Sequence, residues 1–156
     1  MPRRVIVIGV GNRLRGDDAA GLEAVRRLRD RRLPASITAT AHEGEAIELQ
    51  ELWDGADAVV LVDALSSDAP AGTVRRFDAS HGAPASALSR SSSHAIGIGD
   101  AVELGRVLGT LPAALVVYGI EGARFELGAP LSDEVASALD ELIAAVHEEA
   151  LRLAGA

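Results

Sequence analysis

A continuous apolar run, Val5–Val10, leads directly into the turn GVGNRLRGDD, which ends at Asp17 and Asp18. The run is rich in β-branched residues and is ended by glycines, a pattern typical of a parallel strand buried on both faces. An amphipathic segment begins near Asp17, so the order is strand, glycine-bearing turn, carboxylate pair and helix. Because open α/β sheets bind their ligands at the carboxyl ends of strands, the turn is a candidate functional site.

The alternation of strands and helices continues along the chain. Strands are expected over residues 3–10, 36–41, 56–65, 73–79 and 114–120. Helices are expected over residues 17–32, 45–53 and 94–109, and again after the capping residue Ser132. Segment 73–79 follows its predecessor without an intervening helix, so we expect it to be antiparallel or at an edge. These elements predict one domain over residues 1–156, with a three-layer α/β/α fold around a twisted, mixed, mostly parallel five-stranded sheet.

The composition removes many kinds of active site. All 15 basic residues are arginine and there is no cysteine, which excludes catalytic lysines, cysteine nucleophiles and thiolate metal sites. Any bound metal must therefore be held by histidine and carboxylates. The net charge of −8 disfavours nucleic acids and anionic membranes as partners. No apolar run approaches the about 20 residues of a membrane span, and the N-terminal run lacks the features of a secretory signal, so a cytoplasmic location is expected.

Two further residues could join the carboxylates of the first turn. Asp63 ends the apolar strand VVLVD, where a buried charge needs a partner or a metal; the alternative is a cap for the turn at Ser66 or Ser67. His94 stands at the start of a helix, where the helix dipole favours the neutral, metal-binding imidazole; the alternative is a surface or capping residue. If the strands are ordered 2-1-3, Asp63 lies opposite Asp18.

Other residues carry weaker signals. His42, Glu43 and Glu45 follow the second strand at the same edge of the sheet and are second-tier candidates for contact with a substrate. Asp17 could cap the first helix or remain solvated near its N-terminus. Serine catalysis is disfavoured because no G-x-S-x-G turn is present. A dinucleotide-binding fingerprint is disfavoured because Leu14 occupies its third glycine position.

Taken together, four motifs resemble those of the nickel–iron hydrogenase maturation endopeptidases. They are GVGNRLRGDD, VLVDAL around Asp63, SSSHAIGI around His94 and the closing VVYGIEGARFELGAPLSDEV. They occur in the family's order and cover nearly the whole chain. The resemblance implies a twisted mixed sheet of the phosphorylase/hydrolase-like type with one antiparallel strand. There are two departures from the family's pattern. Many members carry glutamate or Asp-Gly at the first turn, where Asp18 is followed here by Ala19, and the shorter aspartate changes the reach of the ligand slightly. The sequence HEGE at residues 42–45 replaces a Gly-Gly-Thr-like turn, which bears on which hydrogenase is processed.

The resemblance also implies a function. Members of this family remove a C-terminal peptide from the large-subunit precursor of a nickel–iron hydrogenase after nickel insertion. The residues implicated in binding the nickel region correspond to Asp18, Asp63 and His94, which are therefore the expected catalytic and metal-contacting set. The nickel would be supplied by the precursor, and no organic cofactor is expected. We expect the protein to act as a monomer on this protein partner.

Two mechanisms fit these residues. In one, the metal docks the scissile region, and a water molecule polarised by the metal or activated by Asp17 or Asp63 attacks the peptide carbonyl. In the other, paired carboxylates share a proton, as in an aspartic-type protease. A standard zinc protease is disfavoured because no H-E-x-x-H helix is present. Two other functions stay open: a non-catalytic chaperone that binds nickel or the precursor, and a small-molecule metal hydrolase.

Overall fold

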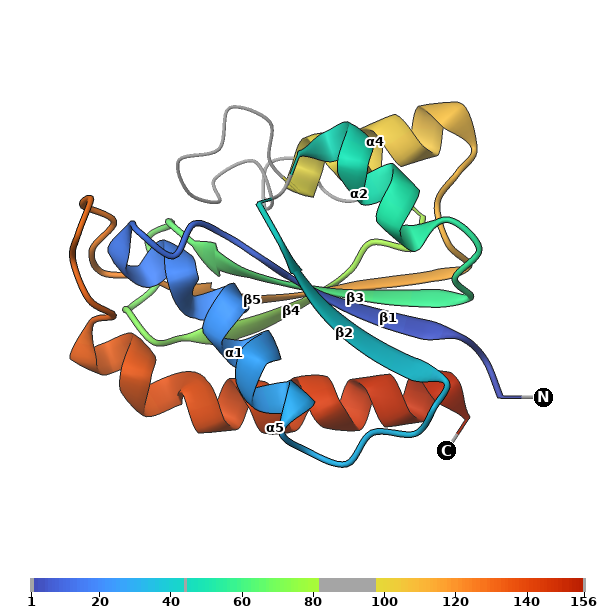
Figure 1. Cartoon of the computed structure of the whole chain (residues 1–156). Coiled ribbons are helices and arrows are strands. Elements are labelled where there is room, and N and C mark those ends of the chain that lie inside the picture. Colours follow the sequence, from blue (N-terminus) through green and yellow to red (C-terminus); the bar gives the residue numbers. More distant parts are fainter. Residues whose placement is uncertain (1, 44, 82–97, 156) are drawn as a thin grey trace.

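A five-stranded mixed sheet forms the centre of the fold (Figure 1). In this computed structural model, which describes residues 2–43, 45–81 and 98–155, the strand order is β2-β1-β3-β5-β4. The strands are β1 (Val5–Val10), β2 (Ile37–His42), β3 (Ala58–Leu65), β4 (Val74–Asp78) and β5 (Ala114–Glu121). The first four strands in the spatial order are parallel, whereas β4 pairs antiparallel with β5 at one edge. The expected mixed sheet and its antiparallel edge strand are both confirmed.

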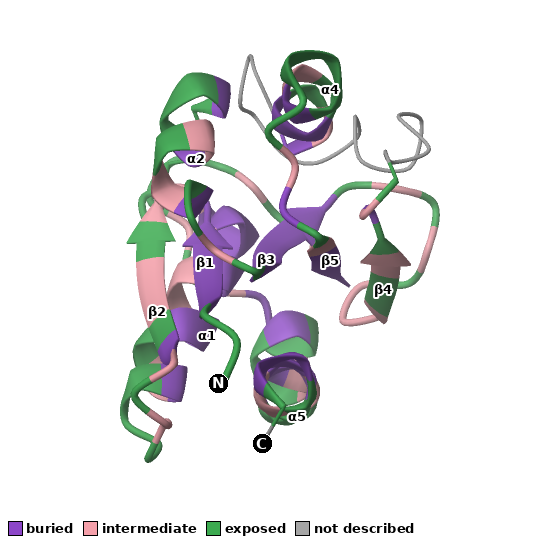
Figure 2. Ribbon diagram, turned by 90° about the vertical axis from the view of Figure 1, so that its right-hand side faces the viewer, coloured by how far each residue is buried: buried purple, intermediate pink, exposed green. Residues whose placement is uncertain are grey.

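Helices cover both faces of the sheet. After the 3-10 helix η1 (Gly16–Ala19) come α1 (Ala20–Arg29), α2 (Ala46–Trp53), α4 (Ile98–Leu108) and α5 (Asp133–Ala154). Figure 2 shows α1 and α5 on one side of the sheet and α2 and α4 on the other, so the three-layer prediction is confirmed. None of the helices in the described ranges is long and apolar enough to cross a membrane.

The central strands are apolar throughout because both of their faces are buried. On β1, Val5 and Val7 pack towards α1 and α5, while Ile6 and Ile8 pack towards α2 and α4. Successive side chains of a strand point to opposite faces, so only a continuous apolar run can supply both cores. The final helix contributes the apolar face predicted from its sequence, namely Val135, Leu139, Leu142, Ile143 and Val146.

Asp17 and Asp18 do not occupy the N-cap position of a helix, contrary to the expectation from the sequence that one of them caps the first helix. Both lie in η1, and the N-cap positions of η1 and α1 are occupied by Arg15 and Ala19, whose side chains make no cap bond. Both residues are buried. The first helix ends at Arg29, short of its expected end near residue 32. The expected cap of the last helix is confirmed, because the hydroxyl of Ser132 accepts a hydrogen bond from a backbone N–H in the first turn of α5.

A buried ionic network fastens the antiparallel edge strand to the last helix. Glu149 of α5 accepts hydrogen bonds from Arg76 Nε on β4 at 2.6 Å and from Tyr118 Oη on β5 at 3.1 Å. Arg152, on the next turn of α5, also donates to this carboxylate. Burial raises the pKa of Glu149, but the hydrogen bonds from Arg76 and Arg152 outweigh burial and hold the pKa below its ordinary value. Glu149 is therefore ionised at neutral pH.

Glu149→Gln should lower the free energy of unfolding by about 2 kcal/mol at neutral pH, because Arg76 loses its counter-charge. Since the folded-state pKa of Glu149 is lowered, its contribution is present above the pKa of an unfolded glutamate and is lost as the pH falls through the folded-state value. The difference between wild type and variant should therefore shrink below about pH 4. Urea unfolding across this pH range measures it, with Glu148→Gln at the exposed neighbouring position as control. A difference that does not change with pH would contradict this account.

Candidate functional site

Glycines let the first turn close tightly on the edge of the sheet. Gly11 has φ +154°, and a Cβ there would lie 1.9 Å from the carbonyl oxygen of Asp18. The N–H of Asn12 donates to that same oxygen at 3.2 Å. Gly21 of α1 packs on the backbone of β1 and β3, where a Cβ would lie 2.3 Å from the carbonyl oxygen of Val62. Because Gly11 and Gly21 have no side chain, Asp18 and the start of α1 lie directly against the ends of β1 and β3.

The carboxylate of Asp17 ties this turn to a distant loop, residues 122–132, which joins β5 to α5. Its Oδ2 accepts hydrogen bonds from the N–H groups of Ala123 at 2.6 Å and Arg124 at 3.1 Å, and its Oδ1 accepts from the N–H of Ser132 at 2.7 Å. The N–H of Asp17 donates in turn to the carbonyl of Arg124 at 2.8 Å. A fully buried carboxylate needs such donors in place of water. Asp17 therefore holds two segments of the site together.

Asp18 and Asp63 lie at the carboxyl ends of neighbouring strands. β1 and β3 are adjacent, with Gly9 paired to Val62, so the expected strand order 2-1-3 is confirmed. Asp18 follows β1 in η1, which packs against β3. Asp63 shares a face of β3 with Leu61, which packs towards α2 and α4. The two residues are 0% and 1% exposed, and buried carboxylates at a sheet edge suit metal binding or proton transfer.

Glu121 is a fourth buried carboxylate at this end of the sheet, and it was not predicted from the sequence. It ends β5, is 1% exposed, and accepts hydrogen bonds from the N–H of Ser67 at 3.0 Å and from the Ser67 hydroxyl. Arg75 Nη1 lies 4.0 Å from it. Ser67 is thus held by Glu121. Oδ1 of Asp63 accepts a hydrogen bond from the N–H of the next residue, Ala64, at 2.8 Å. The signal for Glu121 is in the sequence, because VVYGIE ends in an acid as VVLVD does.

The third residue of the predicted set, His94, lies outside the described residues. Within the described ranges, no three His, Asp or Glu side chains form a group that could hold a metal ion. Asp18 and Asp63 are the described members of the set, and the complete set of Asp18, Asp63 and His94 stays a prediction.

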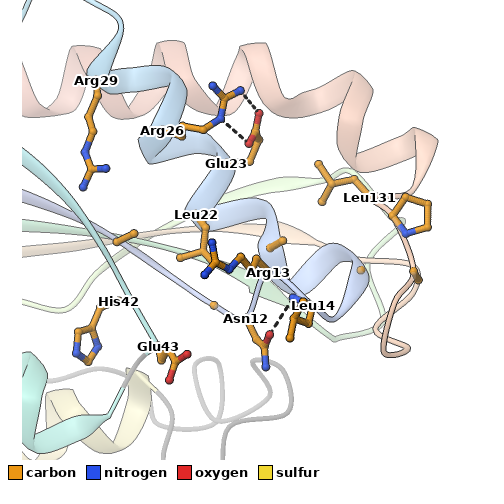
Figure 3. Close-up of a pocket in the computed structure, with 16 residues that line it drawn as sticks. Asn12, Arg13, Leu14, Leu22, Glu23, Arg26, Arg29, His42, Glu43 and Leu131 are labelled. Carbon is orange, nitrogen blue, oxygen red and sulfur yellow. Dashed lines mark hydrogen bonds and ion pairs between the residues drawn. The ribbon is translucent and has the colours of Figure 1, made fainter.

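A groove of about 730 Å³ opens beside the first turn (Figure 3). Its walls come from the turn after β1, the outer face of α1, the end of β2 and the loop at residues 129–131. The second-tier candidates His42 and Glu43 line it, whereas Glu45 does not and instead precedes α2. Nε2 of His42 lies 2.7 Å from Oε2 of Glu48 on α2, so the end of β2 is attached to the helix that follows it.

Asp17→Asn should release residues 122–132 from the first turn, because an amide NH₂ replaces an oxygen that accepts backbone hydrogen bonds. The free energy of unfolding should fall by about 2 kcal/mol. Hydrogen exchange of the amides of Ala123, Arg124 and Ser132 should become faster, and amide exchange measured by NMR tests this directly. Asp68→Asn, at an exposed position, is the matched control. Unchanged exchange at all three amides would show that the carboxylate does not hold the loop.

The chain matches hydrogenase maturation proteases in sequence. The model of the family described as hydrogenase maturation protease (HycI) matches residues 45–149. Over 150 residues the chain is 27% identical to the Hydrogenase 2 maturation protease of Escherichia coli K12, a match that covers 93% of this chain and 92% of that protein.

Solved structures agree with the fold. The hydrogenase maturating endopeptidase HybD from Escherichia coli superimposes with a TM-score of 0.81 at 25% identity, covering 96% of this chain and 92% of that chain. The NiFe hydrogenase maturation protease HybD from Thermococcus kodakarensis gives a TM-score of 0.76 at 28% identity, covering 94% and 99%. With a family match over most of its length and the same fold, this chain belongs to the hydrogenase maturation protease family, a family of peptidases.

Proposed function

We propose that this protein is an endopeptidase that removes the C-terminal extension from the large-subunit precursor of a nickel–iron hydrogenase after nickel insertion. The observation that carries the proposal is the pair of buried carboxylates, Asp18 and Asp63, at the ends of neighbouring strands in a chain of this family. The groove beside the first turn gives a polypeptide substrate somewhere to lie. The match to a family of maturation proteases favours a protein substrate over a small molecule.

Peptide-bond hydrolysis requires a water molecule at the carbonyl carbon and a base for its proton. A buried carboxylate of the pair takes the proton as the water oxygen bonds to the carbonyl carbon. The proton then passes to the departing nitrogen as the C–N bond breaks. The second proton of the water stays on the new C-terminal carboxyl group of the large subunit and is released to solvent at neutral pH, and the released peptide carries a free amine. Burial of Asp18 and Asp63 keeps this proton transfer away from bulk water.

In this proposal nickel belongs to the substrate. Asp18, Asp63 and His94 contact the nickel region of the precursor, so an enzyme without a metal of its own can distinguish a loaded precursor from an empty one. Imidazole is a common nickel ligand, and carboxylates complete a set that contains no thiolate. The precursor supplies the remaining ligands, so the free enzyme should bind nickel only weakly.

Incubation with nickel-loaded and nickel-free precursor tests the proposal. The loaded precursor should yield a shortened large subunit and one released peptide by mass spectrometry, and the nickel-free precursor should stay intact. A homologous protease that cuts the same precursor serves as positive control. If the precursor binds to this protein but is never shortened, the protein is a non-catalytic chaperone and the proposal is wrong.

Substitution of the proposed site residues should abolish cleavage without unfolding the protein. Asp63→Asn and His94→Ala should each reduce the rate of cleavage by at least about 100-fold, because each removes a group that contacts the reacting region. The thermal midpoint of each variant, measured alongside, should stay close to that of wild type. Asp140→Asn, whose side chain is 93% exposed, is the matched control and should cleave normally. Full activity in either site variant would remove that residue from the set.

A further inference from the structure

The outer side of β2 carries backbone groups whose direction follows from the sheet. β2 pairs only with β1 among the described strands. The carbonyls of Ser36 and His42 accept hydrogen bonds from N–H groups of β1 and the turn after it, at 2.9 and 3.1 Å. Alternate residues of a strand direct their N–H and C=O groups to opposite edges. Even-numbered residues of β2 therefore face β1, and Ile37, Ala39 and Ala41 face outwards.

The first half of this outer edge is already occupied. The N–H of Ile37 donates to the carbonyl of Pro34 at 3.0 Å, and Nε of Arg29 donates to the carbonyl of Ala39 at 2.8 Å. Side chains that cap an edge in this way hinder its pairing with another chain. Ala41, the last outward residue, is exposed and lines the groove. Within the described part of the chain, the outer edge of β2 is thus occupied at Ile37 and Ala39, away from the first turn. It is available for pairing at Ala41, next to that turn.

The groove connects this open end of β2 to the turn that carries Asp18. Gly11 and Asn12 form the wall nearest the turn, and a Cβ on Gly11 would lie 3.8 Å from Oδ1 of Asp18. The groove has a volume of about 730 Å³. A groove of this size admits an extended segment of polypeptide and excludes a folded domain.

The groove carries surplus positive charge on a protein whose net charge is −8. Its charged lining consists of three arginines, Arg13, Arg26 and Arg29, and two acids, Glu23 and Glu43. Glu23 accepts two hydrogen bonds from Arg26, and these bonds are the main reason that the pKa of Glu23 is lowered to about 2. Arg13 is exposed and forms no ion pair in the described ranges. A segment that carries carboxylates therefore complements this lining.

We propose that the C-terminal extension of the precursor binds in this groove as an added strand beside the end of β2. Its backbone pairs with the outward N–H and C=O of Ala41, and the carboxylates that it carries, its free C-terminus included, are attracted to Arg13 and Arg29. Backbone pairing at a sheet edge gives affinity without fixing the bound sequence, and side chains in the groove then select it. The inference rests on the proposed function, because it assigns the groove to the segment that the enzyme removes.

A synthetic peptide that spans the cut site and the extension of the precursor tests the strand pairing. Methylation of the one peptide N–H that faces Ala41 should weaken binding about tenfold, because one hydrogen bond is lost. Methylation of the next peptide N–H, which points away from β2, should leave the Kd near that of the unmodified peptide. Fluorescence anisotropy measures the Kd, and hydrogen exchange at the Ala41 amide should slow when peptide binds. Equal effects at successive positions would overturn the pairing.

Cleavage of the nickel-loaded precursor tests the charge of the groove. Arg13→Gln should raise KM about fivefold at low salt, with kcat unchanged and a smaller effect at high salt. Arg32→Gln, at an exposed position outside the groove, is the matched control. If wild type cuts the precursor and Arg13→Gln keeps the wild-type KM at low salt, the groove assignment is wrong and the proposed function stands. If wild type leaves the precursor uncut, the proposed function is wrong. The peptide-binding experiment then tests by itself whether a polypeptide segment pairs with β2 in the groove.

Discussion

Three backbone N–H groups converge on the carboxylate of Asp17, and the shape of the site end of the sheet depends on them. Through these bonds the loop at residues 122–132 is held against the turn that follows β1. The carboxylate is fully buried, so loss of its donors would leave a charge without solvation. The first turn is consequently fixed relative to residues 122–132. Asp18, the next residue after Asp17, is fixed with it.

The buried acids at the carboxyl ends of the strands have two different roles. Asp17 and Glu121 each hold a loop, the first at residues 122–132 and the second at Ser67, after β3. Asp18 and Asp63 lie at the strand ends between these anchored loops, and the proposed chemistry is assigned to them. The hydrogen bonds of Asp17 and Glu121 reach loops that lie far away in the sequence, whereas Asp63 accepts a hydrogen bond from the N–H of the next residue, Ala64. Burial alone therefore does not separate a structural carboxylate from a proposed catalytic one, because all four acids are buried.

The sequence predicted the sheet well because the signals there are local. An apolar run without alternation indicates a strand buried on both faces, and the absence of a helix before β4 indicated its antiparallel place. The role of Asp17 could not be predicted, because its partners lie 106 to 115 positions away and the local pattern resembles a helix cap. The groove could not be predicted either, since four separate segments form its walls. Asp63 was singled out by an acid at a strand end, a rule that applied equally to Glu121.

The bonds of Asp17 also set the order in which the molecule can be completed. They join parts of the chain that are made far apart in time, so the first turn cannot reach its final shape until synthesis has passed Ser132. β1 can pair with β2 and β3 well before then, since those strands follow it within the first 65 residues. A nascent chain on the ribosome therefore carries the sheet edge before it carries the finished turn. Under the proposed function, the enzyme stays inactive until residues 122–132 have been made, so a chain that stops before them cannot cut a precursor.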